Sequence, residues 1–578
     1  MSDRPKTQLL SRRQTAGRLL QHRPDLSVVR NQRRRARELA ASLGNRAGVI
    51  NVLAAWLGGN PDSDVRDLST VLDNRLQLHL VSVPPQERTP EVTEAGLVEE
   101  AFGLGWEQLT DSGVAEALMY ISLAAGLPIP QELVSDLAQV SSDVLEAIVE
   151  AGFAQRDDSA CLTIDGSTLQ FLDARQEPSQ ERPHRQLQFA LGIRNHCGTA
   201  APGRVEIDAL GELATNLLRE LQQPLPIASL SHRLAERARR RGDLSGAMVW
   251  IRHGSEIAQK LADDGLPFLG LFALDEACVV LQEKGALSAR PHVHRAARIL
   301  SAANNAGHPG AGEALFRARL LRAQIEGATQ PVPSERELRT LTGKLQRQQD
   351  TPARAVALQS LGSACFHKGD HKVGRELLGE ARKLLESLDS SEDGALASLL
   401  VAEAQSLSHS NNPEIAHDLL ERARVLGGGD MDRPPQPSLP LALHELGLAA
   451  GNRGDQDAAA TLLDEAAMLA TSLLPPFHPV RATTAYSRGL LFLSHGEFRR
   501  AEKQIERALA GWSGAYPTDH PIQSIGRAAR AWVSVRSGEI SPEEAVATVD
   551  IAIGALVNAP GWTEQLQSLR ANLAAVPV

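Results

Sequence analysis

The sequence lacks the features that would place the chain in a membrane or link it covalently. It has no run of 18 apolar residues and no apolar segment near the N-terminus, so we expect a cytoplasmic protein that makes no membrane contact. Four cysteines lie far apart, with no C-x-x-C pair and no histidine at ligand spacing: Cys161, Cys197, Cys278 and Cys365. Neither a zinc site nor a disulfide framework is therefore expected.

Motifs for enzymatic chemistry are missing as well. The sequence has no G-x-S-x-G nucleophile turn and no G-x-x-x-x-G-K-[ST] loop for phosphates, and His444-Glu445 lacks the second histidine of a metalloprotease helix. Cys365 is close to His367 in sequence, but a cysteine on an inner helix face is far more often a core residue than a nucleophile. We expect a non-enzymatic protein with no cofactor and no metal.

The composition favours helices. Aromatic residues make up only 3% of the 578 residues, while Ala, Leu, Gly and Arg are abundant. Such a mixture forms helix more readily than strand. With 42% hydrophobic residues, the chain has enough apolar side chains to bury several packed cores. We therefore predict an all-α fold.

Basic charge is concentrated near the N-terminus. The net charge of -10 argues against a general nucleic-acid binder. Residues 1–37 nevertheless hold eleven Lys and Arg against two Asp, including Arg12, Arg13, Arg30, Arg33, Arg34, Arg35 and Arg37. We expect residues 1–36 to form a basic, solvated extension that leads into a helix, and contact with an acidic partner or with nucleic acid stays open.

A repeat of 42 or 43 residues is the strongest pattern in the sequence. In the clearest unit, small residues lie at 0, +12 and +19, a Gly-Asp pair at +7 and a large apolar residue at +16: Gly362, Gly374, Ala381, Gly369-Asp370 and Leu378. The same offsets recur after Gly447 and Gly489. The eight reference positions are Ala235, Cys278, Leu320, Gly362, Ala404, Gly447, Gly489 and Ala531.

Each offset has a physical reason. Two antiparallel helices pack closely only where small residues lie at their crossing, and the large apolar residue fills the remaining gap. A Gly or Asn at +7 ends the first helix in a left-handed conformation, and the acidic residue beside it caps the second helix. Each pair leaves an apolar face that the next pair covers, so we predict a solenoid of eight helix pairs over residues 226–565.

This pattern resembles the tetratricopeptide repeat in its long form, as in kinesin light chains, which implies a right-handed superhelical solenoid. His478-Pro479 and His520-Pro521 are 42 residues apart and each open a repeat, which strengthens the resemblance. HEAT and armadillo repeats have a similar period but do not explain the small residues at 0, +12 and +19. A Gly- and Pro-rich interruption from Gly427 to Pro440 predicts a mobile loop between two repeats.

The residues before the repeats are organised differently. Helical periodicity covers about 98–124 and breaks at 127–130; short helices at 131–138 and 143–151 and extended segments at 153–156 and 161–164 follow. Three helices and a hairpin predict a winged-helix domain over 91–175. Because residues 131–151 carry five acidic residues and no Lys or Arg, we do not expect this domain to bind nucleic acid. A helical subdomain at 37–90, a helical connector at 176–225 and a C-terminal tail at 566–578 complete the prediction.

Residues 33–173 resemble the C-terminal part of STAND-type (NB-ARC-like) signalling ATPases. The resemblance rests on a helix that stops at Gly44, an apolar helix at 49–57, an entry from Trp106 to Leu109, and the winged helix. That family needs a P-loop to hold its nucleotide, and the sequence has none. Arg46-Ala47 also replaces the Leu-Pro expected after Gly44. The departures imply that this chain alone does not hydrolyse ATP.

We expect a scaffold that binds another protein or a peptide in a concave groove lined by the first helix of each pair. Counting from the reference positions gives the partner-binding residues His232, Glu236, Arg239, Arg240, Arg317, Gln324, Gln359, Ser363, Phe366, His367, Gln405, His409, His444, Asn452, Tyr486, Leu490, Trp532 and Arg536. The alternative is a sensor or regulatory subunit of a split STAND-type signalling or bacterial defence system, whose ATPase or effector is a separate chain.

Overall fold

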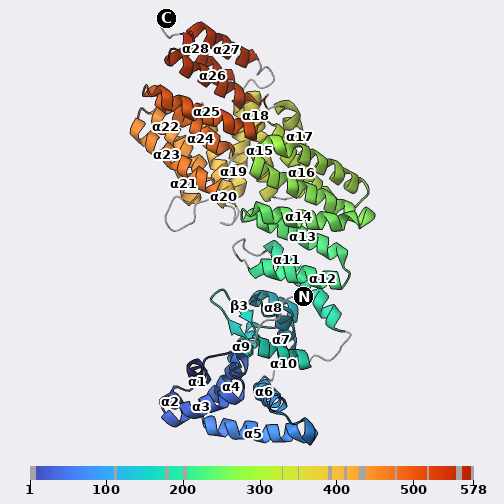
Figure 1. Ribbon diagram of the computed structural model, residues 1–578. Coiled ribbons are helices and arrows are strands. Elements are labelled where there is room, and N and C mark those ends of the chain that lie inside the picture. Colours follow the sequence, from blue (N-terminus) through green and yellow to red (C-terminus); the bar gives the residue numbers. More distant parts are fainter. Residues whose placement is uncertain are drawn as a thin grey trace. The chain divides into compact units, whose positions relative to one another are not determined.

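The chain divides into two compact units, Met1–Ile257 and Ala258–Val578 (Figure 1). The computed structural model describes residues 8–109, 113–175, 181–199, 204, 206–327, 330–348, 351–387, 393–408, 413–428, 438–474, 478–516, 518, 520–554 and 563–574. Nearly all of these residues are helical, so the predicted all-α fold is confirmed.

The first unit begins with helices that surround α4. Val49, Ile50, Val52 and Leu53 on this helix are all fully buried, because a helix that is apolar on every side must be covered on every side. Helices α1, α6 and α10 contact it. The elements up to α6 are α1 (Arg12–Leu19), α2 (Pro24–Ser27), α3 (Arg30–Ser42), α4 (Ala47–Gly59), α5 (Val65–Val81), η1 (Pro85–Glu87) and α6 (Pro90–Trp106).

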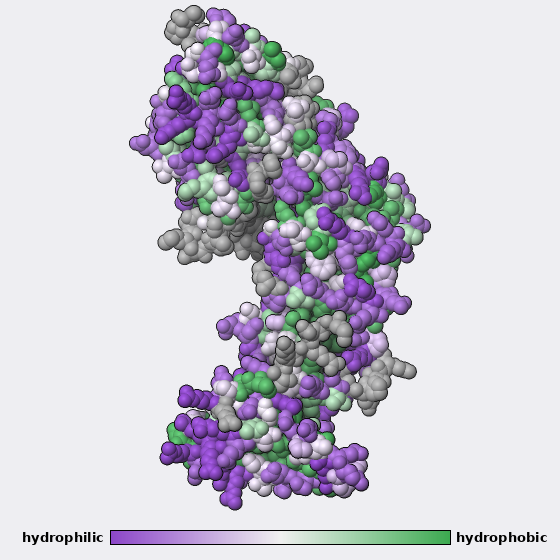
Figure 2. All heavy atoms as spheres, viewed as in Figure 1, coloured by the Kyte–Doolittle hydropathy of each residue, from purple (hydrophilic) through white to green (hydrophobic). Residues whose placement is uncertain are grey.

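The prediction of a solvated extension at residues 1–36 is wrong for the described residues. Leu19 and Leu20 are buried because α1 packs against α3 and α4. Helix α3 is amphipathic: it buries Gln32, Ala36 and Leu39 and exposes arginines. The number of arginines alone therefore does not indicate that one side of this helix faces the core. Figure 2 shows the hydrophilic surface over this end of the unit. The arginines exposed on α3 at this end are Arg30, Arg33, Arg34 and Arg37.

A winged helix follows, and it has one strand more than the sequence predicted. The sheet order is β1-β3-β2, with Ile129 paired to Leu162 and Gln155 paired to Thr163. Residues 127–130, predicted only as a break between helices, contain the additional strand β1, and the single helix predicted at 98–124 is two helices, α6 and α7. The elements are α7 (Gly113–Leu123), β1 (Ile129–Pro130), α8 (Gln131–Ala138), α9 (Ser142–Glu150), β2 (Gln155–Arg156), β3 (Cys161–Thr163) and α10 (Gly166–Arg175).

Two helices lead from the winged helix to the first predicted repeat. Helix α13 packs against both of them, and the Arg237 side chain, 2% exposed, lies 3.4 Å from Asp208 on α12. A charge this deeply buried is stable only with such a partner. The helices are α11 (Glu181–Thr199), α12 (Glu206–Glu220), α13 (Pro224–Arg240) and α14 (Leu244–Gln259).

The second unit is a row of antiparallel helix pairs. Seven of the eight predicted reference positions lie here, each on the first helix of a pair, and the eighth, Ala235, lies on α13 of the first unit. Helix α15 contains both helices of its pair, because Gly285, with φ of 81°, breaks it in the middle. The elements are η2 (Ala262–Gly265), α15 (Leu266–Asn305), α16 (Ala311–Glu326), α17 (Pro331–Gln348), α18 (Thr351–Lys368), α19 (His371–Glu386), α20 (Asp393–Ser408), α21 (Pro413–Leu426), α22 (Leu439–Asn452), α23 (Gln456–Leu473), α24 (Pro479–Ser494), α25 (Phe498–Ala515), α26 (Pro521–Arg536), α27 (Pro542–Gly554) and α28 (Thr563–Ala574).

The helix crossings explain the small residues of the repeat. A Cβ added to Gly447 would lie 2.9 Å from Leu463, and one added to Gly489 would lie 2.7 Å from Ile505. In both pairs the large residue is 16 positions after the glycine, as the sequence pattern predicts. The turn glycine Gly454, with φ of +86°, ends the first helix in the left-handed region that favours glycine.

The C-terminal end differs from the predicted tail at 566–578. Helix α28 places Leu566 and Leu573 in one apolar cluster with Ala545 and Val549 of α27, so its described part closes the row of pairs. The periodicity gave no sign of it because a closing helix starts no new pair. Most of the loop predicted from Gly427 to Pro440 lies outside the described residues, and its last residue, Pro440, belongs to the first turn of α22.

Candidate functional site

The first helices of three successive pairs are joined by a run of polar contacts. Gln405 Nε2 on α20 donates to Glu445 Oε1 on α22 at 2.9 Å. The same oxygen lies 3.0 Å from Nδ1 of His444, and Nε2 of His444 lies 2.8 Å from Ser487 Oγ on α24. Because a carboxylate accepts, Nδ1 donates to Glu445, and in the neutral imidazole Nε2 then accepts from the serine hydroxyl. The structure thus brings together the predicted residues Gln405 and His444.

A second contact of this kind joins α16 to α18. Gln324 Nε2 donates to Ser360 Oγ at 2.8 Å. Gln359 and Ser363 are half-buried on α18, and the Ser363 hydroxyl donates to the Gln359 carbonyl at 3.1 Å. Arg317 is exposed on α16. These helices therefore carry polar side chains at positions that helix packing does not require to be apolar.

Aromatic residues dominate the face farther along the row. Tyr486 and Leu490 on α24 and Trp532 on α26 are half-buried around one apolar cluster. Burial raises the pKa of Tyr486 to about 12. The Tyr486 ring lies 5.2 Å from the ring of Trp512, between centroids. The side chains at these predicted groove positions are therefore mainly apolar.

The remaining predicted groove residues on these helices do not form one continuous surface. Phe366 packs against Gly374 of α19 inside its own pair, since a Cβ on that glycine would lie 2.8 Å from the ring. Arg536 lies over the Phe498 ring of α25, 5.9 Å from its centroid. Asn452 is exposed at the end of α22, and His409 lies outside the described residues.

The basic start of the predicted groove lies in the first unit and is partly neutralised. His232 and Glu236 are each 8% exposed on α13. Arg240 forms an ion pair with Glu236 at 2.7 Å, one helical turn away, and Arg239 is half-buried. The spacing along the helix predicts that these residues share one side, but it does not predict that Glu236 forms an ion pair with Arg240.

His478 and His520 cap helices, a role that the repeat pattern does not predict for them. Nδ1 of His520 accepts the Ile522 backbone N–H at 3.2 Å and so caps α26, and the His520 ring stacks on Tyr516 with centroids 4.0 Å apart. Burial, followed by the nearby charge of His367, lowers the pKa of His520 to about 3. Burial also lowers the pKa of His367 to about 4. The repeated His-Pro pairs were the sequence signal, because His478 caps α24 in the same way.

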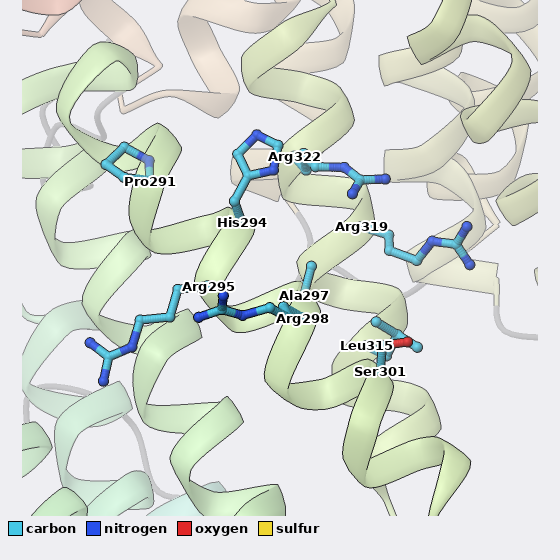
Figure 3. Close-up of a pocket in the computed structure, with 9 residues that line it drawn as sticks. All are labelled: Pro291, His294, Arg295, Ala297, Arg298, Ser301, Leu315, Arg319 and Arg322. Atoms are coloured by element: carbon cyan, nitrogen blue, oxygen red, sulfur yellow. The ribbon is translucent and has the colours of Figure 1, made fainter.

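A basic pocket of about 770 Å³ lies between the second half of α15 and α16 (Figure 3). Arg295 and Arg298 border it on α15, and Arg319 and Arg322 border it on α16. Positions two apart on a helix are about 200° around its axis, so Arg319 faces away from Arg317. The repeat pattern predicts groove residues only on the opposite side of α16, so it does not predict this pocket.

The described residues contain neither a metal-binding cluster nor a membrane-spanning helix. No group of three or more His, Cys, Asp or Glu side chains gathers there in a way that could hold a metal ion. None of the helices in this part of the chain is both long and apolar enough to cross a membrane.

No protein-family model and no curated protein matches this chain. Solved structures of similar arrangement include a Signal Transduction ATPase with Numerous Domains (STAND) protein with a tetratricopeptide repeat sensor from Pyrococcus horikoshii, at 12% identity and TM-score 0.46, covering 98% of this chain and 75% of that one. The apo form of the quorum sensor NprR from B. thuringiensis matches at 10% identity and TM-score 0.44, over 65% of this chain and 99% of that one. A Rap protein complexed with Competence and Sporulation Factor matches at 13% identity and TM-score 0.41, over 61% and 99%.

Proposed function

We propose that this chain is a non-enzymatic scaffold that holds a protein or peptide partner against the first helices of its repeats. The observation that carries the proposal is the run of polar side chains across α20, α22 and α24, made by Gln405, Glu445, His444 and Ser487. His444 and Ser487 are buried, but Gln405 is exposed and Glu445 is half-buried, so the part of this run on α20 and α22 lies where a partner can contact it.

The composition of the face favours an extended or helical segment of another protein. Amides, hydroxyls and a carboxylate offer donors and acceptors near Gln359 and Gln405, while Tyr486 and Trp532 add apolar area farther along. Aromatic side chains combined with a few polar groups are the usual composition of protein-binding surfaces.

Site-specific photocrosslinking in cells of the source organism tests this proposal. A photoreactive amino acid at Gln405 should crosslink to one defined protein, whereas the same group at exposed Arg499 on the second helix α25 should not. Equal crosslinking from both positions would contradict binding at the first helices. Mass spectrometry of the crosslinked peptide then identifies which segment of the partner is bound.

A second function is favoured by the winged helix that precedes the repeats. We propose as the alternative a sensor or regulatory subunit of a split STAND-type signalling or defence system, with ATPase or effector activity on another chain. The sequence has no G-x-x-x-x-G-K-[ST] loop, so nucleotide would have to bind elsewhere in such a system. Identification of a P-loop ATPase as the crosslinked partner supports this alternative, and saturable binding of Mg-ATP to this chain alone contradicts it.

A further inference from the structure

The arginines around the pocket between α15 and α16 outnumber the carboxylates that contact them. Arg319 Nε and Arg322 Nη2 share one carboxylate, Glu337, at 2.8 and 2.7 Å. Arg298 is exposed, and no carboxylate of the described residues forms an ion pair with it. Three guanidinium groups are therefore compensated by a single acidic side chain on this part of the wall.

The remainder of the wall does not remove this excess. Arg295 lies 3.7 Å from Glu276, and Arg290 and His294 share Glu326 at 3.3 and 2.8 Å. Arg290 does not line the pocket, but with it included the five arginines meet three carboxylates, which leaves two positive charges. A basic concavity with uncompensated charge attracts anions and raises their local concentration.

We propose that this pocket binds a phosphate group, carried by a phosphorylated compound or by a phosphorylated side chain. A phosphate monoester bears a charge of about -1.5 to -2 at neutral pH, which matches the excess, whereas one carboxylate leaves a positive charge unpaired. Guanidinium groups also bind phosphate oxygens through two parallel hydrogen bonds. The volume of about 770 Å³ exceeds what a phosphate alone fills, so the phosphate is one end of a larger ligand.

The arginine side chains lie on both sides of the pocket and do not converge on one point (Figure 3). Arg295 and Arg298 extend to one side of the view and Arg319 and Arg322 to the other, with Ser301 and Leu315 at the lower end (Figure 3). Arg298 has to turn toward the cavity to contact a ligand there. Its exposed side chain can do so at low cost, because it has no ion pair to break.

This inference does not depend on the proposed function. The pocket arginines on α16 lie on the opposite side of that helix from Arg317 and Gln324, so a partner at the first helices leaves the pocket open. Crosslinking from Gln405 and phosphate binding at Arg298 can accordingly succeed or fail separately.

Calorimetric titration of the full chain tests the phosphate site. The probes are inorganic phosphate, a phosphoserine peptide, and the same peptide without phosphate. We expect saturable binding of the phosphorylated probes that Arg298→Glu weakens at least tenfold, since the substitution reverses one charge at the site. Arg499→Glu, at an exposed arginine on α25, is the matched control and should bind like the wild type.

The two ligand sources give different results. Tighter binding of the phosphoserine peptide than of inorganic phosphate identifies a phosphorylated protein segment, and the reverse order identifies a small phosphorylated compound; either order supports the site. The proposal is overturned if no phosphorylated probe saturates, if both variants lose binding equally, or if the unphosphorylated peptide binds as well. Melting curves of both variants confirm that each is folded.

Discussion

Gly285, at the turn inside α15, lies against Ala515 at the end of α25: a Cβ on the glycine would be 2.6 Å from the alanine Cα. The helix pair within α15 thus touches the pair formed by α24 and α25, although four pairs lie between them in sequence. The contact closes one turn of the helix row in the second unit, and it places backbone against backbone, where no side chain can move aside.

Gly285→Ala should therefore destabilise the second unit. The new methyl group meets the backbone of Ala515, and the φ of 81° is unfavourable for alanine, so we expect a loss of about 1–3 kcal/mol in the free energy of unfolding. Urea unfolding followed by circular dichroism measures this loss. Gly379→Ala on α19, where an added Cβ meets nothing within 4 Å, is the control and should stabilise by about 0.5–1 kcal/mol. Equal effects of the two substitutions would refute the closure.

The buried contact between His444 and Ser487 gives a second prediction. Ser487→Ala leaves Nε2 of a histidine that is 1% exposed without its hydroxyl partner, which should cost about 1–3 kcal/mol of unfolding free energy. Ser494→Ala on the same helix removes an exposed hydroxyl and should change stability by less than about 0.5 kcal/mol. If Ser487→Ala is as mild as its control, the polar contacts across these helices do not stabilise the row.

Stability should fall in acid because of His520 and His367. Burial lowers the pKa values of these histidines to about 3 and about 4 from the ordinary 6.5. As the pH falls below 6.5, the unfolded state takes up protons that the folded state still refuses, so the free energy of unfolding decreases until the folded pKa values are reached. Above pH 6.5 this loss is absent.

His520→Asn separates this effect from general acid denaturation. Asparagine can still cap α26, but it does not titrate, so the slope of stability between pH 6 and 4 should decrease by up to about 1.4 kcal/mol per pH unit. Unfolding in urea at several pH values measures the slope. His495→Asn removes an exposed imidazole and is the matched control. An unchanged slope in His520→Asn would show that His520 is not held neutral by the fold.

The sequence predicted contacts that recur and missed contacts that occur once. The crossing of Gly447 with Leu463 repeats every 42 or 43 residues, so periodicity alone located it and its equivalents. The approach of Gly285 to Ala515 has no counterpart in another pair and leaves no periodic signal. The pocket near Arg298 was missed for a related reason, since the reference positions mark only one side of each first helix.

Composition misled the prediction at both ends of the chain. The arginines near the N-terminus suggested a solvated extension, yet Leu19 and Leu20 supply enough apolar surface to fold α1 onto its neighbours. At the other end, Leu566 and Leu573 are seven positions apart, which places them on one side of α28, but two residues are too few for a pattern to stand out.

The affinity of the crosslinked partner for two matched double variants tests the central claim most directly. Ser363→Arg with Gln405→Arg places bulk and charge on the first helices α18 and α20, and Glu376→Arg with Asp418→Arg does so at exposed positions on the second helices α19 and α21 of the same pairs. We predict at least a tenfold rise in Kd for the first variant, no change for the second, and wild-type helical signals for both. Loss of binding only in the second variant would show that the partner does not bind at the first helices.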